Sequence, residues 1–115
     1  MGQTQQVKIT TEYLAERDGP ECVWCGRKMW SQDWSIEHLC PRNRGGHKTE
    51  ENALLACRIC NSARKSQSAV AFARQQELSG YQPRWELLRK ALSNLSVSER
   101  KAHQKYGLSQ LRHLG

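Results

Sequence analysis

The chain has 115 residues and a formal net charge of +7 at pH 7, from 18 lysines and arginines against 11 aspartates and glutamates. With 37% hydrophobic residues, it can bury one modest core, so we expect a single domain with a helical extension. No stretch has the length of a membrane span or the layout of a signal peptide, which predicts a cytoplasmic protein without a membrane partner. The basic excess favours a polyanion, although charge alone does not identify one.

The first part of the chain predicts one short helix and one strand. Residues 1–10 are polar and are expected to form a flexible N-terminus, and Thr11–Asp18 predicts a helix that Gly19 and Pro20 end. Large apolar residues alternate with polar ones between Met29 and Leu39, which is the period of a half-buried strand. We expect Pro41 to end this strand.

The later part predicts a loop, a second strand and helices. Gly45, Gly46 and five charged residues indicate a loop over 42–51, and the apolar run Ala53–Ala56 predicts a strand that returns beside the first. Helices are expected from Arg58, over Ala69–Leu78 and over Arg84–Leu95. A capping box at Ser96–Glu99 predicts a last helix that ends at Gly107. His103 and His113 are expected at the surface.

Four of the five cysteines form two Cys-x-x-Cys pairs, at Cys22 and Cys25 and at Cys57 and Cys60. Such pairs present two sulfurs each to one ion, and two pairs make a closed, structural zinc site. A thioredoxin-like redox pair is the alternative, but the chain lacks the βαβ pattern that accompanies it. Cys40, the fifth, is most simply a small buried apolar residue.

Between the cysteine pairs lies Glu37-His38. A neutral histidine can take a proton from water near pH 7, and a carboxylate can ligate a cation. Adjacent strand residues point to opposite faces, so the two side chains share a site only where the strand ends or twists. Asn52 follows 14 residues after His38, and Asn61 follows nine residues later.

This combination resembles the HNH (His-Me finger, ββα-metal) endonuclease family in its zinc-bound four-cysteine form. The resemblance covers about residues 17–65 and rests on the two cysteine pairs with Gly26, Glu37-His38 with Pro41, Gly45-Gly46, Asn52, and Asn61 with Lys65. It implies an α+β fold in which a ββα-metal finger, stapled by zinc, is followed by helices. The domains would be 11–65 as the nuclease and 66–115 as a basic helical extension, which holds a net charge of +5 from eight basic and three acidic residues.

The resemblance also implies roles. His38 would be the general base, Asn52 would orient its imidazole and brace the strands, and Glu37 and Asn61 would hold one catalytic cation. Because both of these offer oxygen ligands, the cation is expected to be Mg2+ or Mn2+. Glu37 and Asn61 stand where other members have histidines. The residues expected to contact substrate phosphates are Arg42, Arg44, Arg64 and Lys65.

The expected function is metal-dependent hydrolysis of DNA phosphodiester bonds, by the protein alone, as a homodimer or within a larger DNA-processing complex. A phage, mobile-element or restriction nuclease would have such a sequence. One rival is a zinc-stabilised nucleic-acid-binding module without catalysis. A secreted nuclease toxin is the second rival, which the lack of a delivery domain disfavours. For residues 66–115 two roles stay open, a basic platform for DNA and a packing element.

Overall fold

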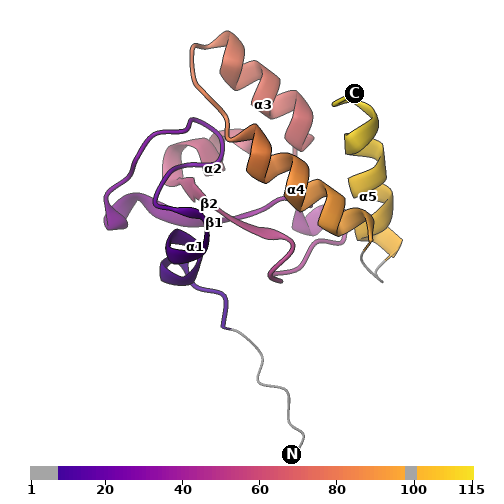
Figure 1. Cartoon of the computed structure of the whole chain (residues 1–115), viewed down its shortest axis with the longest axis horizontal. Coiled ribbons are helices and arrows are strands. Elements are labelled where there is room, and N and C mark those ends of the chain that lie inside the picture. The colour runs from indigo at the N-terminus through magenta and orange to yellow at the C-terminus, as the bar shows by residue number, and fades with distance from the viewer. Residues whose placement is uncertain (1–7, 98–100) are drawn as a thin grey trace, which may run out of the picture.

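The computed structural model describes residues 8–97 and 101–115, and they form an α+β fold around one two-stranded sheet. The elements, in chain order, are α1 (Thr11–Asp18), the 3-10 turn η1 (Ser31–Asp33), β1 (Trp34–His38), the 3-10 turn η2 (Arg42–Arg44), β2 (Ala53–Cys57), α2 (Arg58–Arg64), α3 (Ala69–Leu78), α4 (Trp85–Ser96) and α5 (Lys101–Arg112). In Figure 1, α1 and α3 lie on opposite sides of the strands. The predicted fold class is confirmed. None of the helices described is long and apolar enough to cross a membrane.

The sheet is an antiparallel hairpin in which Trp34 pairs with Cys57 and His38 pairs with Ala53. Strand β2 is buried along its whole length, as its sequence Ala-Leu-Leu-Ala-Cys requires. Strand β1 is shorter than the predicted strand over Met29–Leu39. In its expected first half, Ser31–Asp33 form η1 instead, and the Met29 amide donates to the Pro20 carbonyl beside the first cysteine pair.

The last helix is also longer than predicted. Gly107, expected to end it, lies inside α5 and is buried. A Cβ at this position would lie 2.7 Å from the Leu92 carbonyl oxygen of α4, so the missing side chain lets the two helices approach closely. Ser98 and Glu99, the second half of the predicted capping box, fall outside the described residues.

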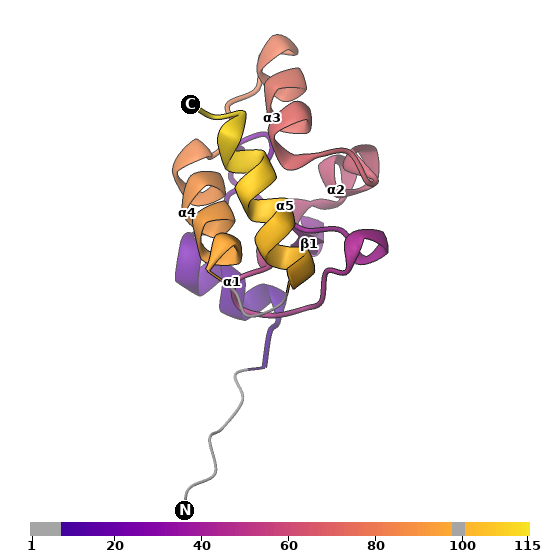
Figure 2. The ribbon, with the colours of Figure 1, turned by 90° about the vertical axis from the view of Figure 1, so that its right-hand side faces the viewer.

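The helices after the sheet pack against it and against each other. Helices α4 and α5 run side by side in both views (Figures 1 and 2). Phe72 of α3 meets the ring of Trp24 edge to face, with ring centroids 5.2 Å apart. The large side chains that are fully buried come from every part of the described chain and include Leu14, Leu39, Leu55, Phe72, Leu88, Leu92 and Leu95. The extension therefore shares one core with the strands.

The predicted flexible N-terminus lies outside the described residues as far as residue 7. Within the described residues, Ile9 is buried, and the Thr10 side chain accepts a hydrogen bond from the Tyr13 amide at 3.0 Å, which caps α1.

Candidate functional site

The four paired cysteines meet at one point. Their sulfur atoms lie within 4.8 Å of one another, and all four residues are buried. A tetrahedral zinc ion with Zn–S bonds of about 2.3 Å holds its sulfurs about 3.8 Å apart, so the cluster suits such an ion. The residues present therefore fit a structural zinc.

The sulfurs are surrounded by donors that suit thiolates. The Trp24 amide donates to the Cys22 sulfur and the Cys60 amide to the Cys57 sulfur, each at 3.3 Å. The Cys60 thiol lowers the pKa of Cys22 to about 5 by hydrogen bonding to its sulfur, whereas burial raises the pKa of Cys25 to about 11. Zinc binds cysteines in the thiolate form, so a bound ion would displace the remaining thiol protons.

One donor to the cluster comes from a residue that no sequence pattern singles out. Gln76, buried in α3, donates from Nε2 to the Cys60 sulfur at 3.3 Å. An amide in a helix is too common in sequence to mark a metal site. Helix α3 therefore contributes to the zinc site as well as to the core.

The cysteine cluster ties together the segments that carry the other predicted residues. The Val23 amide donates to the Leu55 carbonyl, which docks the first cysteine pair on β2. Cys57 ends β2 and its sulfur caps α2, the helix that holds Asn61. A metal at this point would thus fix the strand hairpin to α2.

His38 ends β1 and its imidazole is half buried. Its Nε2 atom is buried and has no hydrogen-bond partner within the described part of the chain. Burial lowers the pKa of His38 below its ordinary value, and the nearby positive charges of Arg42 and Lys48 lower it further. The lowered pKa favours the neutral imidazole, and no protein group in the described residues engages its Nε2 atom.

Glu37 points to the other face of β1 and is 4% exposed. Its Oε2 accepts a hydrogen bond from the Trp24 indole at 2.6 Å, and its Oε1 lies 3.3 Å from Nη1 of Arg64. Burial raises the pKa of Glu37, while Arg64 and Trp24 oppose this shift. A carboxylate has about four lone-pair positions, so these two contacts leave acceptor capacity for a cation.

Arg64, predicted to contact a substrate phosphate, is placed elsewhere. It is 0% exposed, and its guanidinium lies over the Trp24 ring at 5.0 Å. All five of its N–H donors face acceptors: the carbonyls of Gln67, His38 and Leu39, the hydroxyl of Tyr106 and the carboxylate of Glu37. Within the described residues every donor of Arg64 is therefore engaged, and its predicted phosphate contact has no free donor behind it.

Asn52 is fully buried and braces the loop that follows β1. Its Oδ1 accepts from the Cys40 amide at 2.7 Å, and its Nδ2 donates to the carbonyls of Cys40 and His47. A side chain at Gly46 would overlap the Cys40 carbonyl, which explains the glycine there. These hydrogen bonds all go to backbone atoms. In the described residues, no direct contact between Asn52 and the His38 imidazole supports the predicted orienting role.

Asn61 lies on α2 beside β1, on the face that Glu37 shares. Its Nδ2 donates to the Ile36 carbonyl at 2.9 Å and to the Ser35 hydroxyl at 3.0 Å. This arrangement leaves Oδ1 as an oxygen that can ligate a cation. The structure thus brings Glu37 and Asn61 to one side of β1, with His38 at the strand end.

The remaining predicted phosphate contacts are exposed. Arg42 and Arg44 lie on η2, directly after the segment that carries His38, and Lys65 follows the last residue of α2. Lys65 has φ 53° and ψ −124°, a backbone conformation that residues other than glycine rarely adopt. Each of these cations can reach a ligand in solvent.

Both histidines of the extension, His103 and His113, were predicted to lie at the surface, and only one of them does. His103, expected at the surface, is 2% exposed on α5, and its ring centroid lies 6.4 Å from that of His47 in the loop. Its position follows from the packing of α5 on the loop, which no local pattern reveals. His113 is exposed as predicted.

A comparison with protein families agrees with this geometry. A family model described as HNH endonuclease matches residues 22–67, which include both cysteine pairs, Glu37, His38, Asn52 and Asn61. A search of curated proteins found no match. The HNH match indicates nuclease activity. The resemblance to HNH endonucleases, in the form with four clustered cysteines, is therefore confirmed for residues 22–67 of this chain.

Proposed function

We propose that the protein is a metal-dependent DNA endonuclease in which His38 activates water for attack on a phosphodiester bond. One observation carries this proposal: a neutral imidazole whose Nε2 has no hydrogen-bond partner in the described residues, at the strand end beside α2. A general base must be neutral at the working pH and must reach the proton it takes. The lowered pKa of His38 supports the first condition, and for the second, no hydrogen bond in the described residues competes for its Nε2.

Glu37 and Asn61 are the proposed ligands of a catalytic Mg2+ or Mn2+. Their oxygen donors suit a hard cation, and both lie on the α2 side of β1. When bound, such an ion supplies charge that stabilises the leaving oxygen. Glu37 is held for this role by Trp24 and Arg64, while Asn61 is held by the β1 backbone.

DNA is the proposed partner, and the exposed cations near His38 are its proposed phosphate contacts. Arg42, Arg44 and Lys65 keep this role, whereas the buried Arg64 takes a supporting one. A homodimer or a larger DNA-processing complex is compatible with this surface. A zinc-stabilised binding module would also use the cysteines and the basic residues, but it has no use for a buried imidazole with a free nitrogen.

The experiment is cleavage of supercoiled plasmid with added Mg2+, with added Mn2+ and without divalent cation, together with zinc analysis. Glu37→Gln is the informative variant, because glutamine keeps the size of the side chain and an oxygen that can accept from Trp24 or Arg64, whereas alanine leaves both buried donors without an acceptor. We expect Glu37→Gln to keep one zinc ion per chain and to lose cleavage. Loss of zinc from this variant would contradict the separation of the two metal sites.

A further inference from the structure

Helix α5 lies outside the segment that matches the HNH family, yet it reaches the centre of the site. Tyr106 of α5 is buried, and its hydroxyl accepts a hydrogen bond from Nη2 of Arg64 at 2.8 Å. The same hydroxyl accepts one from the Ala69 amide, in the first turn of α3, at 3.0 Å. One oxygen thus joins α5, α2 and α3.

Arg64 passes this contact to the strand that carries the proposed catalytic residues. Its Nη1 donates to the His38 carbonyl at 2.8 Å, and its Nη2 donates to the Leu39 carbonyl at 2.7 Å. Nη1 also faces the Glu37 carboxylate. The guanidinium is planar and rigid, so fixing one side of the fork fixes the other side.

We propose that Tyr106 is a positioning residue, whose hydroxyl holds Arg64 against the end of β1 so that α5 sets the placement of His38 and Glu37. The proposal rests on the proposed function for its catalytic consequence. Its physical basis is the satisfied fork: Arg64 has five donors and five acceptors, and removal of one acceptor leaves a buried, charged donor unpaired. The fork relieves this by shifting, and the carbonyls of His38 and Leu39 shift with it.

The chain offers a matched control on the same helix. Gln110, one turn after Tyr106, accepts a hydrogen bond from the Val70 amide at 3.1 Å. Gln110 therefore joins α5 to the start of α3 as Tyr106 does, but it does not touch Arg64. Gln110→Met removes that bond while keeping the shape, as Tyr106→Phe removes the hydroxyl while keeping the ring.

The test compares the two variants in cleavage and in NMR spectra of the full chain. We expect both to lower the melting temperature, and only Tyr106→Phe to reduce kcat, by about tenfold to a hundredfold at unchanged KM, because small misplacements of catalytic groups cost that much. Only Tyr106→Phe should shift the Arg64 Nε–H signal and the amide signals of His38 and Leu39. Equal kcat losses in the two variants, or an unmoved Arg64 signal in Tyr106→Phe, would overturn the positioning role.

The two readouts separate this inference from the proposed function. If the wild-type protein cleaves no DNA with either cation, the proposed function fails, and the NMR comparison alone decides the role of Tyr106. Arg64 and His38 signals that move in Tyr106→Phe but not in Gln110→Met would then support the positioning role without an activity. Signals that move in neither variant would refute it.

Discussion

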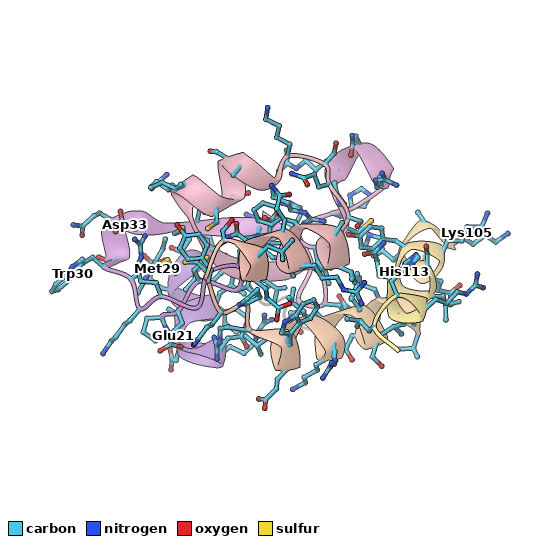
Figure 3. The ribbon with its side chains drawn as sticks, turned by 90° about the horizontal axis from the view of Figure 1, so that it is seen from above. Glu21, Met29, Trp30, Asp33, Lys105 and His113 are labelled. Atoms are coloured by element: carbon cyan, nitrogen blue, oxygen red, sulfur yellow. The ribbon has the colours of Figure 1, made fainter. Side chains whose placement is uncertain are left out.

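Neutralising two cations beside the candidate site should weaken DNA binding more than neutralising two cations on α4. Arg44 and Lys105 are exposed and line one hollow of the surface, between η2 and α5. Figure 3 shows Lys105 projecting outward at the end of the molecule away from Trp30. The pair lies next to the segment that carries His38, so a DNA backbone that enters the site would pass it.

Arg89 and Lys90 of α4 are the matched control pair. Both are exposed, and Lys90 lines a different cavity whose wall includes the carboxylates of Asp18, Glu50 and Glu51. A wall that carries three acidic residues does not suit a phosphate backbone. Replacement of either pair by glutamine removes two charges and spares the buried apolar face of its helix.

The magnitude follows from counterion release. Each phosphate contact contributes about 0.9 to the slope of log affinity against log salt, so loss of two contacts lowers the slope by about 1.8. Over a fourfold rise in salt, the wild-type protein should therefore lose about tenfold more affinity than Arg44→Gln/Lys105→Gln. Arg89→Gln/Lys90→Gln should keep the wild-type slope.

The assay is fluorescence anisotropy of a labelled duplex, titrated with His38→Ala protein at several salt concentrations without added divalent cation. Melting temperatures of both double variants should stay near that of the parent protein, because all four side chains are exposed. Equal slopes for the two variants would refute a DNA path along η2 and α5. A larger effect of the α4 pair would place the DNA on the other side of the molecule.

Two further predictions concern the zinc site and α2. Cys57→Ser should unfold the domain because zinc binding at a closed thiolate site is folding free energy, whereas Gln76→Leu should keep the fold and weaken zinc about tenfold to a hundredfold in a chelator competition, since it removes the donor to Cys60. An unchanged zinc affinity in Gln76→Leu would contradict that role. Lys65→Gly should raise the free energy of unfolding by about 1–3 kcal/mol, since it relieves the positive φ. It should also lower the DNA salt slope by about 0.9, whereas Lys65→Gln should change the salt slope alone. Equal melting temperatures for the two Lys65 variants would show that no strain is stored there.

Local sequence patterns predicted the strand hairpin and the cysteine cluster, because both depend on residues close together in sequence. The alternation around Trp34 and Ile36 and the apolar run of β2 gave the hairpin, and the spacing of the two cysteine pairs gave the metal cluster. These signals are strong because strand period and Cys-x-x-Cys geometry are fixed by the backbone.

Long-range contacts could not be predicted in the same way. Arg64 reads in sequence as one more basic residue near the site, and only the fold reveals that Tyr106, 42 residues later, takes one of its donors. Gly107 reads as a helix stop, because the helix that passes beside it is not visible in the local sequence. The same holds for His103, which α5 buries against the loop after β1.

Plasmid cleavage by His38→Ala beside the wild-type protein, with Mg2+ or Mn2+, tests whether His38 is the general base. Zinc content and DNA affinity are measured on the same preparations. Loss of a general base typically reduces the rate by about 10²–10⁴-fold. We predict a loss of at least that size, with one zinc ion per chain retained and DNA affinity unchanged. Cleavage by His38→Ala at the wild-type rate would contradict it and would favour a zinc-stabilised DNA-binding module.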